Sequence, residues 1–421
     1  MIIRYDKYKI LQYFLLYICM LNTPSKASNM YGDNFIIFTA VLSAVVIALG
    51  YVRLEKKPFY ILGGLCFIIF LQHVLIQNDI SINSFLNTAS KILISYCAVM
   101  IDKESFLRRF VKLTVIVACF SLVFFFLTQI GAESFVSSIL ITNHAPCRTG
   151  NISYGRFLYH HMPNYGRNVG LYNEPGVYQL YLNLALLFLL FQSKKMGLSR
   201  KQTTRYSIVL VVTIITAMST AGYLEMFVII ALYMVSLRKK LSGKKIGFIV
   251  AAIFMLVLFA QTELFQDVFV SKLEWSDEGR FEAGTGNARL ASFMIDFNYI
   301  LQNPLGYGHS NVWVNTSSFA SNEVGSSVGL TTYIVGYGVP IAFLTYTLYC
   351  MAFIRIGEDK IQRIALILSF VLAFSSQPWV MTPVYLTLMV YGIVKKKEEY
   401  SVNNADETHL AQKKHYYLDN Y

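Results

Sequence analysis

Charged residues are scarce in this chain of 421 residues. Asp, Glu, Lys and Arg together make up 14% of it, and apolar residues make up 55%. A soluble chain usually carries about a quarter charged residues. The composition therefore excludes two or three soluble domains and indicates a single polytopic membrane domain with loops.

The chain also has few cysteines and lacks the common nucleotide-binding motif. Five of the six cysteines lie within apolar runs, and Cys147 alone lies in a long polar stretch, so no disulfide framework is expected. The chain has no Gly-x-x-x-x-Gly-Lys-Ser/Thr sequence, which is the loop that cradles nucleotide phosphates. Work driven by ATP is therefore not expected.

Long apolar runs dominate the chain. A helix needs roughly 20 apolar residues to cross about 30 Å of hydrocarbon. Twelve stretches qualify as candidate spans: 9–22, 35–52, 59–77, 82–101, 110–130, 171–192, 206–219, 221–238, 246–261, 328–353, 362–376 and 379–394. We predict an all-α polytopic membrane protein with about 12 transmembrane helices. Residues 1–394 would form one membrane domain and residues 395–421 a polar cytoplasmic tail.

The basic residues alternate between the connections of these spans. Twenty-eight of the 36 Lys and Arg residues fall in connections on one side, and seven fall on the other. Because Lys and Arg concentrate in cytoplasmic loops, both termini are predicted to be cytoplasmic. The formal charge of +12 is thus a topology signal, and the bilayer rather than nucleic acid is the expected partner.

The first span has a second interpretation, as a cleaved signal peptide. Its apolar stretch from Ile10 to Leu21 is short, and Ser25-Lys26-Ala27 resembles a cleavage site. Cleavage would leave eleven spans with the same orientation.

Two outer loops, 131–170 and 262–327, are much longer than the others. Loops of this length are often functional, so chemistry is expected at the outer face. The second loop contains an amphipathic helix from Ala288 to Gln302, with an apolar stripe at Leu290, Met294, Phe297 and Leu301. Asn303-Pro304 should end this helix, which could lie on the bilayer surface as a lid.

The first loop ends with Arg167-Asn168-Val169-Gly170-Leu171-Tyr172-Asn173-Glu174-Pro175-Gly176. Asn173 is the expected N-cap of the sixth span, and proline is favoured in a first turn. This interpretation places Glu174 at the outer mouth of that span.

At these residues the chain resembles the O-antigen polymerase (Wzy) family, within the O-antigen ligase/polymerase group. The resemblance rests on four short segments and on the layout of spans and loops. The segments are Arg167-x-x-Gly170-x-x-x-Glu174-Pro175-Gly176, Ser219-Thr220-Ala221-Gly222, the Arg289 helix running into Asn303-Pro304-Leu305-Gly306-Tyr307-Gly308, and Gly325-Ser326-Ser327-Val328-Gly329-Leu330 with Gly336-Tyr337-Gly338-Val339-Pro340.

The resemblance implies a glycosyltransferase with a GT-C-like membrane fold, without metal or other cofactor, in the bacterial inner membrane. Two undecaprenyl-pyrophosphate-linked oligosaccharides would meet at the periplasmic face, and the growing glycan would be transferred to the incoming repeat unit. A chain-length regulator and a flippase are the partner proteins that it implies.

This chemistry suggests roles for residues of both long loops. Arginine binds departing pyrophosphate well, and of the five outer arginines we select Arg167 and Arg289. Glu174, and after it His309, are candidates for the general base. Tyr172, Tyr178, Tyr307 and Trp313 could stack on sugars, and Asn173 joins them as a substrate-binding candidate. The outer face has no Asp-x-Asp sequence, so we predict no metal site.

Other activities remain open at this point. For the related O-antigen ligase we would expect a His-Asn pair before the following span, whereas residues 317–323 contain no histidine. A capsule or exopolysaccharide polymerase of the same group fits equally well. A flippase or transporter is suggested by the intramembrane charges Lys91 and Glu225, but the chain shows no repeated halves.

Overall fold

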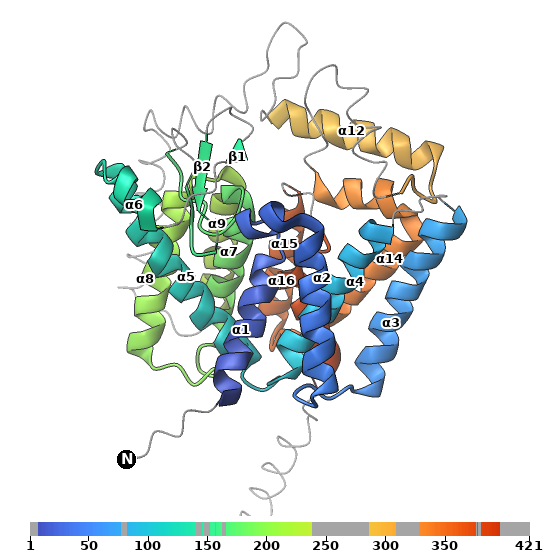
Figure 1. Ribbon diagram of the computed structural model, residues 1–421, viewed down its shortest axis with the longest axis horizontal. Coiled ribbons are helices and arrows are strands. Elements are labelled where there is room, and N and C mark those ends of the chain that lie inside the picture. Colours follow the sequence, from blue (N-terminus) through green and yellow to red (C-terminus); the bar gives the residue numbers. More distant parts are fainter. Residues whose placement is uncertain are drawn as a thin grey trace, which may run out of the picture.

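The computed structural model describes residues 7–76, 82–139, 145–146, 152–155, 157–161, 166–237, 286–308, 328–375, 377 and 380–395. They form a bundle of helices with one small sheet (Figure 1). The elements are α1 (Lys7–Leu21), α2 (Lys26–Ala48), α3 (Lys56–Leu71), the π-helical turn η1 (Gln72–Ile76), α4 (Ile82–Met100), α5 (Phe106–Gln129), α6 (Glu133–Ile139), β1 (Ala145–Pro146), β2 (Ile152–Gly155), β3 (His160–His161), α7 (Pro175–Gln192), α8 (Arg200–Ala217), α9 (Thr220–Ser236), α12 (Gly286–Gln302), α14 (Gly329–Ile356), α15 (Lys360–Phe374) and α16 (Pro383–Val394).

Eleven of the twelve predicted spans coincide with a helix, and the stretch 246–261 lies outside the described residues. Within the described part of the chain, five helices are long and apolar enough to cross a membrane: Lys26–Ala48, Lys56–Val74, Phe106–Gln129, Pro175–Gln192 and Gly329–Ile356. Four shorter apolar helices accompany them. The predicted helical protein with helices of membrane-spanning length is therefore confirmed, with one small sheet beside the helices, while the count of about 12 spans stays a prediction.

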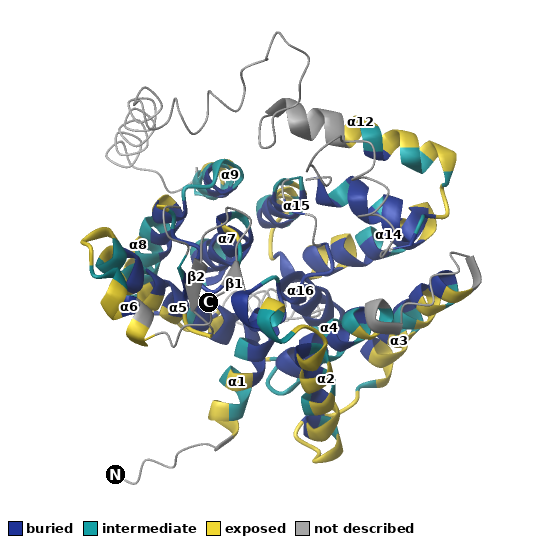
Figure 2. Ribbon diagram, turned by 45° about the horizontal axis from the view of Figure 1, so that its top comes forward, coloured by how far each residue is buried: buried dark blue, intermediate teal, exposed yellow. Residues whose placement is uncertain are grey.

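The core of the bundle surrounds α7 and α16. Figure 2 shows both helices in dark blue among partly exposed neighbours, and every residue of α16 is buried. Gly392 of α16 lies so close to α14 that a Cβ atom there would be 2.4 Å from the Cα of Ala352. Lipid is as apolar as these side chains, so close packing between helices supplies much of the stability.

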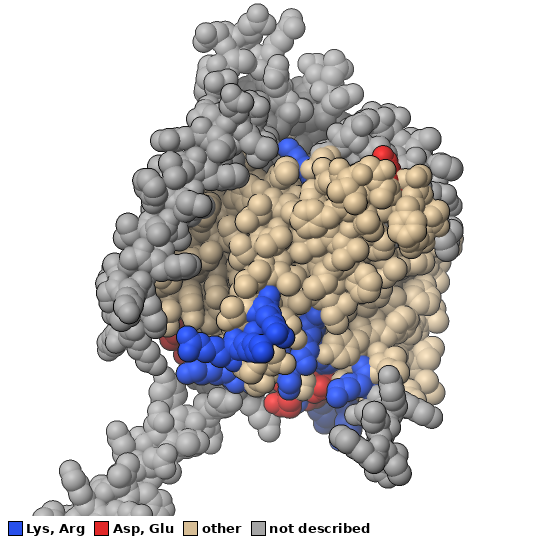
Figure 3. Space-filling view, turned by 90° about the vertical axis from the view of Figure 1, so that its left-hand side faces the viewer, with Lys and Arg blue, Asp and Glu red and all other residues tan. Residues whose placement is uncertain are grey.

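The basic connections meet at one end of the bundle. Lys103 pairs with Glu55 at 2.7 Å, and Lys195 pairs with Glu358 at 3.4 Å, so four connections are joined in two pairs. Figure 3 shows Lys and Arg gathered low on one face, below a wide surface without charges. We call this end the basic end.

The opposite end, which we call the loop end, carries the connections between α1 and α2 and between α5 and α7. The second of these is more ordered than a plain loop, because it contains α6 and a three-stranded antiparallel sheet in the order β1-β2-β3. The pairs Ala145 with Ser153 and Tyr154 with His161 set its register. The backbone N–H of Lys26 donates to the carbonyl of Leu171 at 3.2 Å, which ties the two connections together.

The predicted amphipathic helix of the second loop is confirmed as α12, which lies across the loop end above α14 (Figure 1). Its apolar stripe faces outward, with Met294 and Leu301 54% and 66% exposed. Its other face packs on α14, where the buried Asp296 accepts hydrogen bonds from Thr331 at 2.5 Å and Thr332 at 3.3 Å. Helix α14 bends at Gly338, whose φ of 80° is open to glycine at little cost.

Candidate functional site

The segment 166–176 approaches α7 over the loop end and is held by the buried side chain of Asn168. Its amide donates to Ser121 of α5 at 3.1 Å and to Thr216 of α8 at 3.2 Å. Its carbonyl accepts from the backbone N–H of Gly170 at 3.1 Å. A buried amide with three hydrogen bonds fixes a loop strongly, because breaking them would leave polar groups unpaired. The segment is therefore attached to two helices.

Gly170 allows this segment to cross directly over an aromatic ring. Its φ is +58°, and a Cβ atom there would lie 2.7 Å from the ring of Tyr178. No other residue type combines this backbone conformation with this approach. The Gly170 of the quoted motif thus has a local structural reason.

Tyr172, Tyr178 and Tyr181 form a buried group, the tyrosine cluster, where segment 166–176 enters α7. The rings of Tyr172 and Tyr181 stack at 4.8 Å with an angle of 17°. The hydroxyl of Tyr178 shares a hydrogen bond with Ser121 at 2.8 Å, and that of Tyr181 shares one with Thr23. Neither Tyr172 nor Tyr178 presents a ring face to a sugar here, since both are 0% exposed. In this structure they pack inside the bundle, and their stacking on sugars stays a prediction.

His160 in β3 connects the sheet to the same segment. Its backbone N–H donates to the carbonyl of Gly170 at 2.7 Å, and its Nδ1 contacts the carbonyl of Tyr172 at 2.8 Å, which makes Nδ1 the protonated nitrogen. Burial, opposed by the Tyr172 carbonyl and reinforced by the nearby Lys26 and His161, lowers the pKa of His160 to about 4. The imidazole is therefore neutral at physiological pH.

Glu174 lies at the point where this segment becomes helical. The N-cap of α7 is Glu174 itself, with φ −141° and ψ 144°, and Pro175 occupies the first turn. The expectation that Asn173 is the cap was wrong by one residue, because the Asn173 backbone N–H donates to Pro24 at 3.1 Å and holds that residue in the connection. The Glu174 side chain is exposed and makes no capping hydrogen bond. Its carboxylate is thus available at the loop end.

Arg167 is half-buried at the other end of the segment. It lies close enough to Tyr223, in the first turn of α9, to act on the phenol electrostatically. The Ser219-Thr220-Ala221-Gly222 motif forms the predicted turn here: α8 ends at Ala217, Met218 takes a left-handed conformation, and α9 begins at Thr220. The structure therefore brings the Arg167 motif and this turn together.

The two remaining motifs meet at a second place, the bend of α14. Gly306 and Gly338 approach each other, and a Cβ atom on Gly306 would lie 2.5 Å from the Gly338 nitrogen. Tyr307 donates its backbone N–H to Val335 at 2.9 Å and packs edge-on against Tyr299 at 5.4 Å. We call this arrangement the glycine clasp. It places Tyr307 beside α12 and α14, not in the tyrosine cluster.

The remaining predicted site residues cannot be placed in the same way. Arg289 belongs to α12, but its side chain lies outside the described residues. His309 and Trp313 also lie outside them. Their roles stay predictions.

Some residues that shape these two places were missed in the sequence. Gln72, the first residue of η1, donates from its amide to the carbonyl of Leu305 at 2.6 Å and to that of Tyr337, so it joins η1 to the glycine clasp. The sequence did offer one signal for Gln72, because its amide lies inside an otherwise apolar run. Asn168 was visible within the quoted motif.

Comparison with known proteins gives one family match. The model described as O-antigen ligase matches residues 206–334, which include the turn between α8 and α9, α12 and the first part of α14. No curated protein and no solved structure matches the chain. The matched segment contains three of the four quoted motifs in full or in part, and the Arg167 segment lies before it. Over residues 206–334, the chain is therefore similar to the O-antigen ligase family.

Proposed function

We propose that this protein is an O-antigen polymerase of the bacterial inner membrane. The loop end faces the periplasm, and both termini and the basic end face the cytoplasm. The enzyme joins undecaprenyl-pyrophosphate-linked repeat units by transferring the growing glycan to the incoming unit. The family match supports the group, and the absence of a histidine from residues 317–323 favours the polymerase within it.

In this proposal Glu174 accepts the proton of the attacking sugar hydroxyl. Arg167 and Arg289 bind the pyrophosphate as negative charge develops on it, because guanidinium groups pair with phosphate oxygens in a bidentate way. The bond that breaks joins the growing glycan to its lipid pyrophosphate, and the bond that forms joins the glycan to the acceptor oxygen. His309 is a second candidate for the base, and Asn173, Tyr307 and Trp313 are candidates for binding sugars.

One observation carries the proposal: an exposed carboxylate is held at a fixed point of the loop end. Glu174 makes no capping bond, while its neighbours on both sides are anchored, Asn173 to Pro24 and Pro175 in the first turn of a buried helix. A base that is exposed but positioned can accept a proton from a substrate without first breaking an internal contact. The anchored segment also carries Arg167.

The proposal is tested by deleting the gene and resolving the surface polysaccharide on a gel. We expect the ladder to collapse to core plus one repeat unit, because export and ligation continue. Complementation with Glu174→Gln should fail to restore the ladder, whereas Glu358→Gln, an equal change at the basic end, should restore it. Loss of every O-antigen band, or a full ladder from Glu174→Gln, would contradict the proposal.

An O-antigen ligase is the second candidate, favoured by the description of the matching family model. A ligase moves the finished chain to the lipid A core, so its loss removes all bands attached to the core and leaves glycan on its lipid carrier. Extracting lipid-linked glycan from the deletion strain separates the two candidates. Long chains on the carrier indicate the ligase, and single repeats indicate the polymerase.

A further inference from the structure

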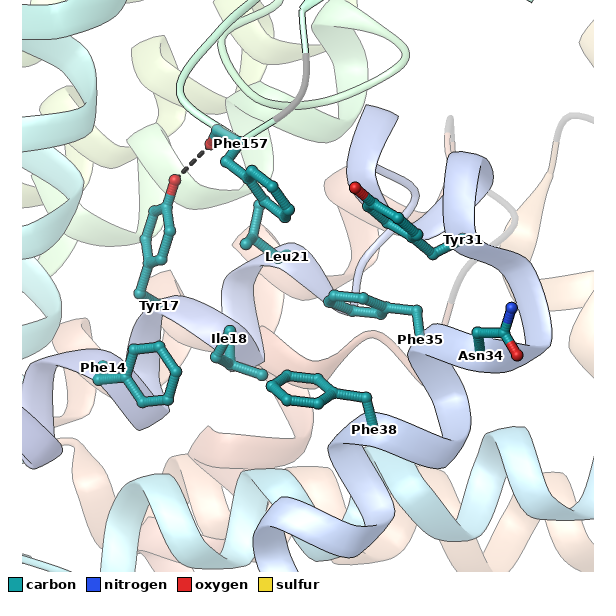
Figure 4. A pocket seen from close by; sticks show the side chains of 9 residues that line it. All are labelled: Phe14, Tyr17, Ile18, Leu21, Tyr31, Asn34, Phe35, Phe38 and Phe157. Atoms are coloured by element: carbon teal, nitrogen blue, oxygen red, sulfur yellow. Dashed lines mark hydrogen bonds between the residues drawn. The ribbon is translucent and has the colours of Figure 1, made fainter. Parts of the chain in front are cut away.

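An apolar groove of about 440 Å³ lies between α1 and α2 in their loop-end halves. Figure 4 shows Phe14 and Ile18 facing it from α1, Phe35 and Phe38 from α2, and Phe157 above it. Of the nine lining residues, eight are aromatic or aliphatic. Phe14 and Phe38 are 41% and 46% exposed, so the groove opens to the outside of the bundle. Because α2 is long and apolar enough to span a membrane, we expect this opening to face hydrocarbon in a bilayer.

The bend of α2 at Gly32 helps to form the groove. Gly32 has φ 46° and ψ −124°, which interrupts the helix, and its surroundings are open. The turn before the bend runs across the loop end, and the turns after it run down the bundle beside α1 (Figure 1). Tyr31 and Phe35 therefore face the groove from two directions.

The roof of the groove belongs to the loop that carries the candidate site. The carbonyl of Phe157 accepts a hydrogen bond from the hydroxyl of Tyr17, and its ring stacks on Tyr31 at 6.0 Å with an angle of 14°. Three residues further along, His160 contacts Gly170 and Tyr172. A molecule in the groove would thus have its outer end beside segment 166–176.

We propose that this groove binds the polyisoprenoid chain of the lipid-linked substrate, an inference that rests on the proposed function. The occupant needs an apolar chain at membrane depth and a polar head at the loop end, and a prenyl pyrophosphate has both. Each isoprene unit carries a double bond and a methyl branch, so the chain is bulkier than a linear acyl chain and fills a wide hollow lined by six aromatic rings. The groove holds the chain while its pyrophosphate lies at the site.

Photolabelling in nanodiscs tests this inference directly. One arm uses undecaprenyl pyrophosphate with a diazirine in its chain, and the other uses phosphatidylglycerol with a diazirine in an acyl chain. We expect the prenyl probe to label peptides of α1 and α2, and an excess of unlabelled undecaprenyl pyrophosphate to displace it. Labelling of these peptides by the phospholipid that undecaprenyl pyrophosphate does not displace would overturn the proposal, since the groove would then hold bulk lipid.

Variants sharpen the test. Ile18→Trp fills the groove and should lower prenyl labelling about tenfold, which corresponds to about 1.4 kcal/mol of binding. Ile37→Trp makes the same change on α2, at a residue that does not line the groove and is 56% exposed. The prenyl probe should label this control to the same extent as the wild type. Phe157→Ala removes the roof of the groove and its ring contact with Tyr31, and should also lower labelling. Equal labelling of Ile18→Trp, Phe157→Ala and Ile37→Trp would count against the groove.

The photolabelling result can be interpreted separately from the test of the polymerase assignment, because labelling requires the probe to bind but does not require the enzyme to turn over. If the deletion strain contradicts the polymerase while displaceable prenyl labelling persists, the groove stands as a prenyl site of another lipid-linked enzyme. If the ladder collapses as expected but α1 and α2 remain unlabelled, this inference alone fails.

Discussion

Gly166 and Gly170 both adopt left-handed backbone conformations in the segment that ends at α7, with φ of +60° and +58°. They differ in their surroundings: a Cβ atom on Gly166 meets nothing within 4 Å, whereas one on Gly170 lies 2.7 Å from the Tyr178 ring. Backbone strain alone should cost Gly166→Ala about 1 kcal/mol. Gly170→Ala should lose about 2 kcal/mol more, because the buried ring has to move.

Unfolding of the two variants in detergent measures this difference. The Gly170→Ala protein should also lose the polysaccharide ladder more fully, since Glu174 is positioned through the same segment. Equal unfolding free energies would show that Tyr178 moves freely and that the segment is not tightly packed.

His160 makes the free energy of unfolding depend on pH, and the direction of this dependence can be predicted. Its pKa is about 4 in the folded protein and 6.5 without perturbation, so between these values the unfolded chain binds a proton that the folded protein excludes. The contribution of the neutral His160 to the free energy of unfolding is complete above about pH 6.5. It falls as the pH drops toward 4, by up to about 1.4 kcal/mol per pH unit. Between pH 6.5 and 5 the wild type should lose about 2 kcal/mol, while His160→Gln should lose less.

The matched control is His161→Gln. His161 pairs with the exposed carboxylate of Glu133 at 3.0 Å, and burial is the main cause of the lowered pKa of His160, so the removal of His161 should leave most of the His160 contribution in place. Unfolding curves at several pH values make the comparison. Parallel pH slopes for wild type and His160→Gln would contradict the assignment of a neutral, buried imidazole.

At the scale of elements, three helices are joined by the buried Glu225 of α9. Its carboxylate accepts from Asn183 of α7 at 3.2 Å and from the hydroxyl of Ser369 of α15. Asn183 also donates to the carbonyl of Gly222 at 3.0 Å, and its own Oδ1 has no hydrogen-bond partner among the described residues. Intramembrane acids often mark transport paths, but these contacts are those of a packing site.

Two variants distinguish the roles of Glu225. Glu225→Gln can keep both contacts, because its amide oxygen can accept from Asn183 while its N–H donates to the hydroxyl of Ser369. Glu225→Leu leaves buried donors unpaired and should be less stable than Glu225→Gln by about 2 kcal/mol. Unfolding in detergent measures the difference, and the ladder should persist in Glu225→Gln. If Glu225→Gln is as stable as wild type yet stops glycan export, a transport role is supported instead.

Helix positions were the part of the fold that the sequence could predict well, because apolar length alone reports a span. The bend of α14 and the interrupted start of α2 were not predicted, since a lone glycine such as Gly338 or Gly32 tolerates many conformations and only tertiary contacts select one. The same limit applies to the sheet of the first loop, whose strands are two to four residues long.

The candidate site was predictable as a segment but not as an arrangement. The motif from Arg167 to Gly176 was recognised in the sequence, and it is indeed ordered against α5, α7 and α8. That Tyr172 and Tyr178 are buried while Glu174 is exposed depends on the direction in which the chain enters α7. Residue spacing does not encode that direction, because the turn at Gly170 decides it.

For the whole molecule, the basic end and the loop end predict a labelling pattern. Lys103, Lys195 and their partners Glu55 and Glu358 lie at one end, and Glu174 lies at the other. With the basic end in the cytoplasm, Glu174→Cys should react with a membrane-impermeant maleimide in cells with a permeabilised outer membrane. Glu358→Cys should react only after the inner membrane is also opened.

Both variants are built on a Cys147→Ser background, because Cys147 lies in the first long loop, whereas the described cysteines lie in membrane helices. The reverse pattern would place Glu174 in the cytoplasm, away from any periplasmic substrate, and would remove the physical basis of the polymerase proposal even if the helical fold were entirely correct.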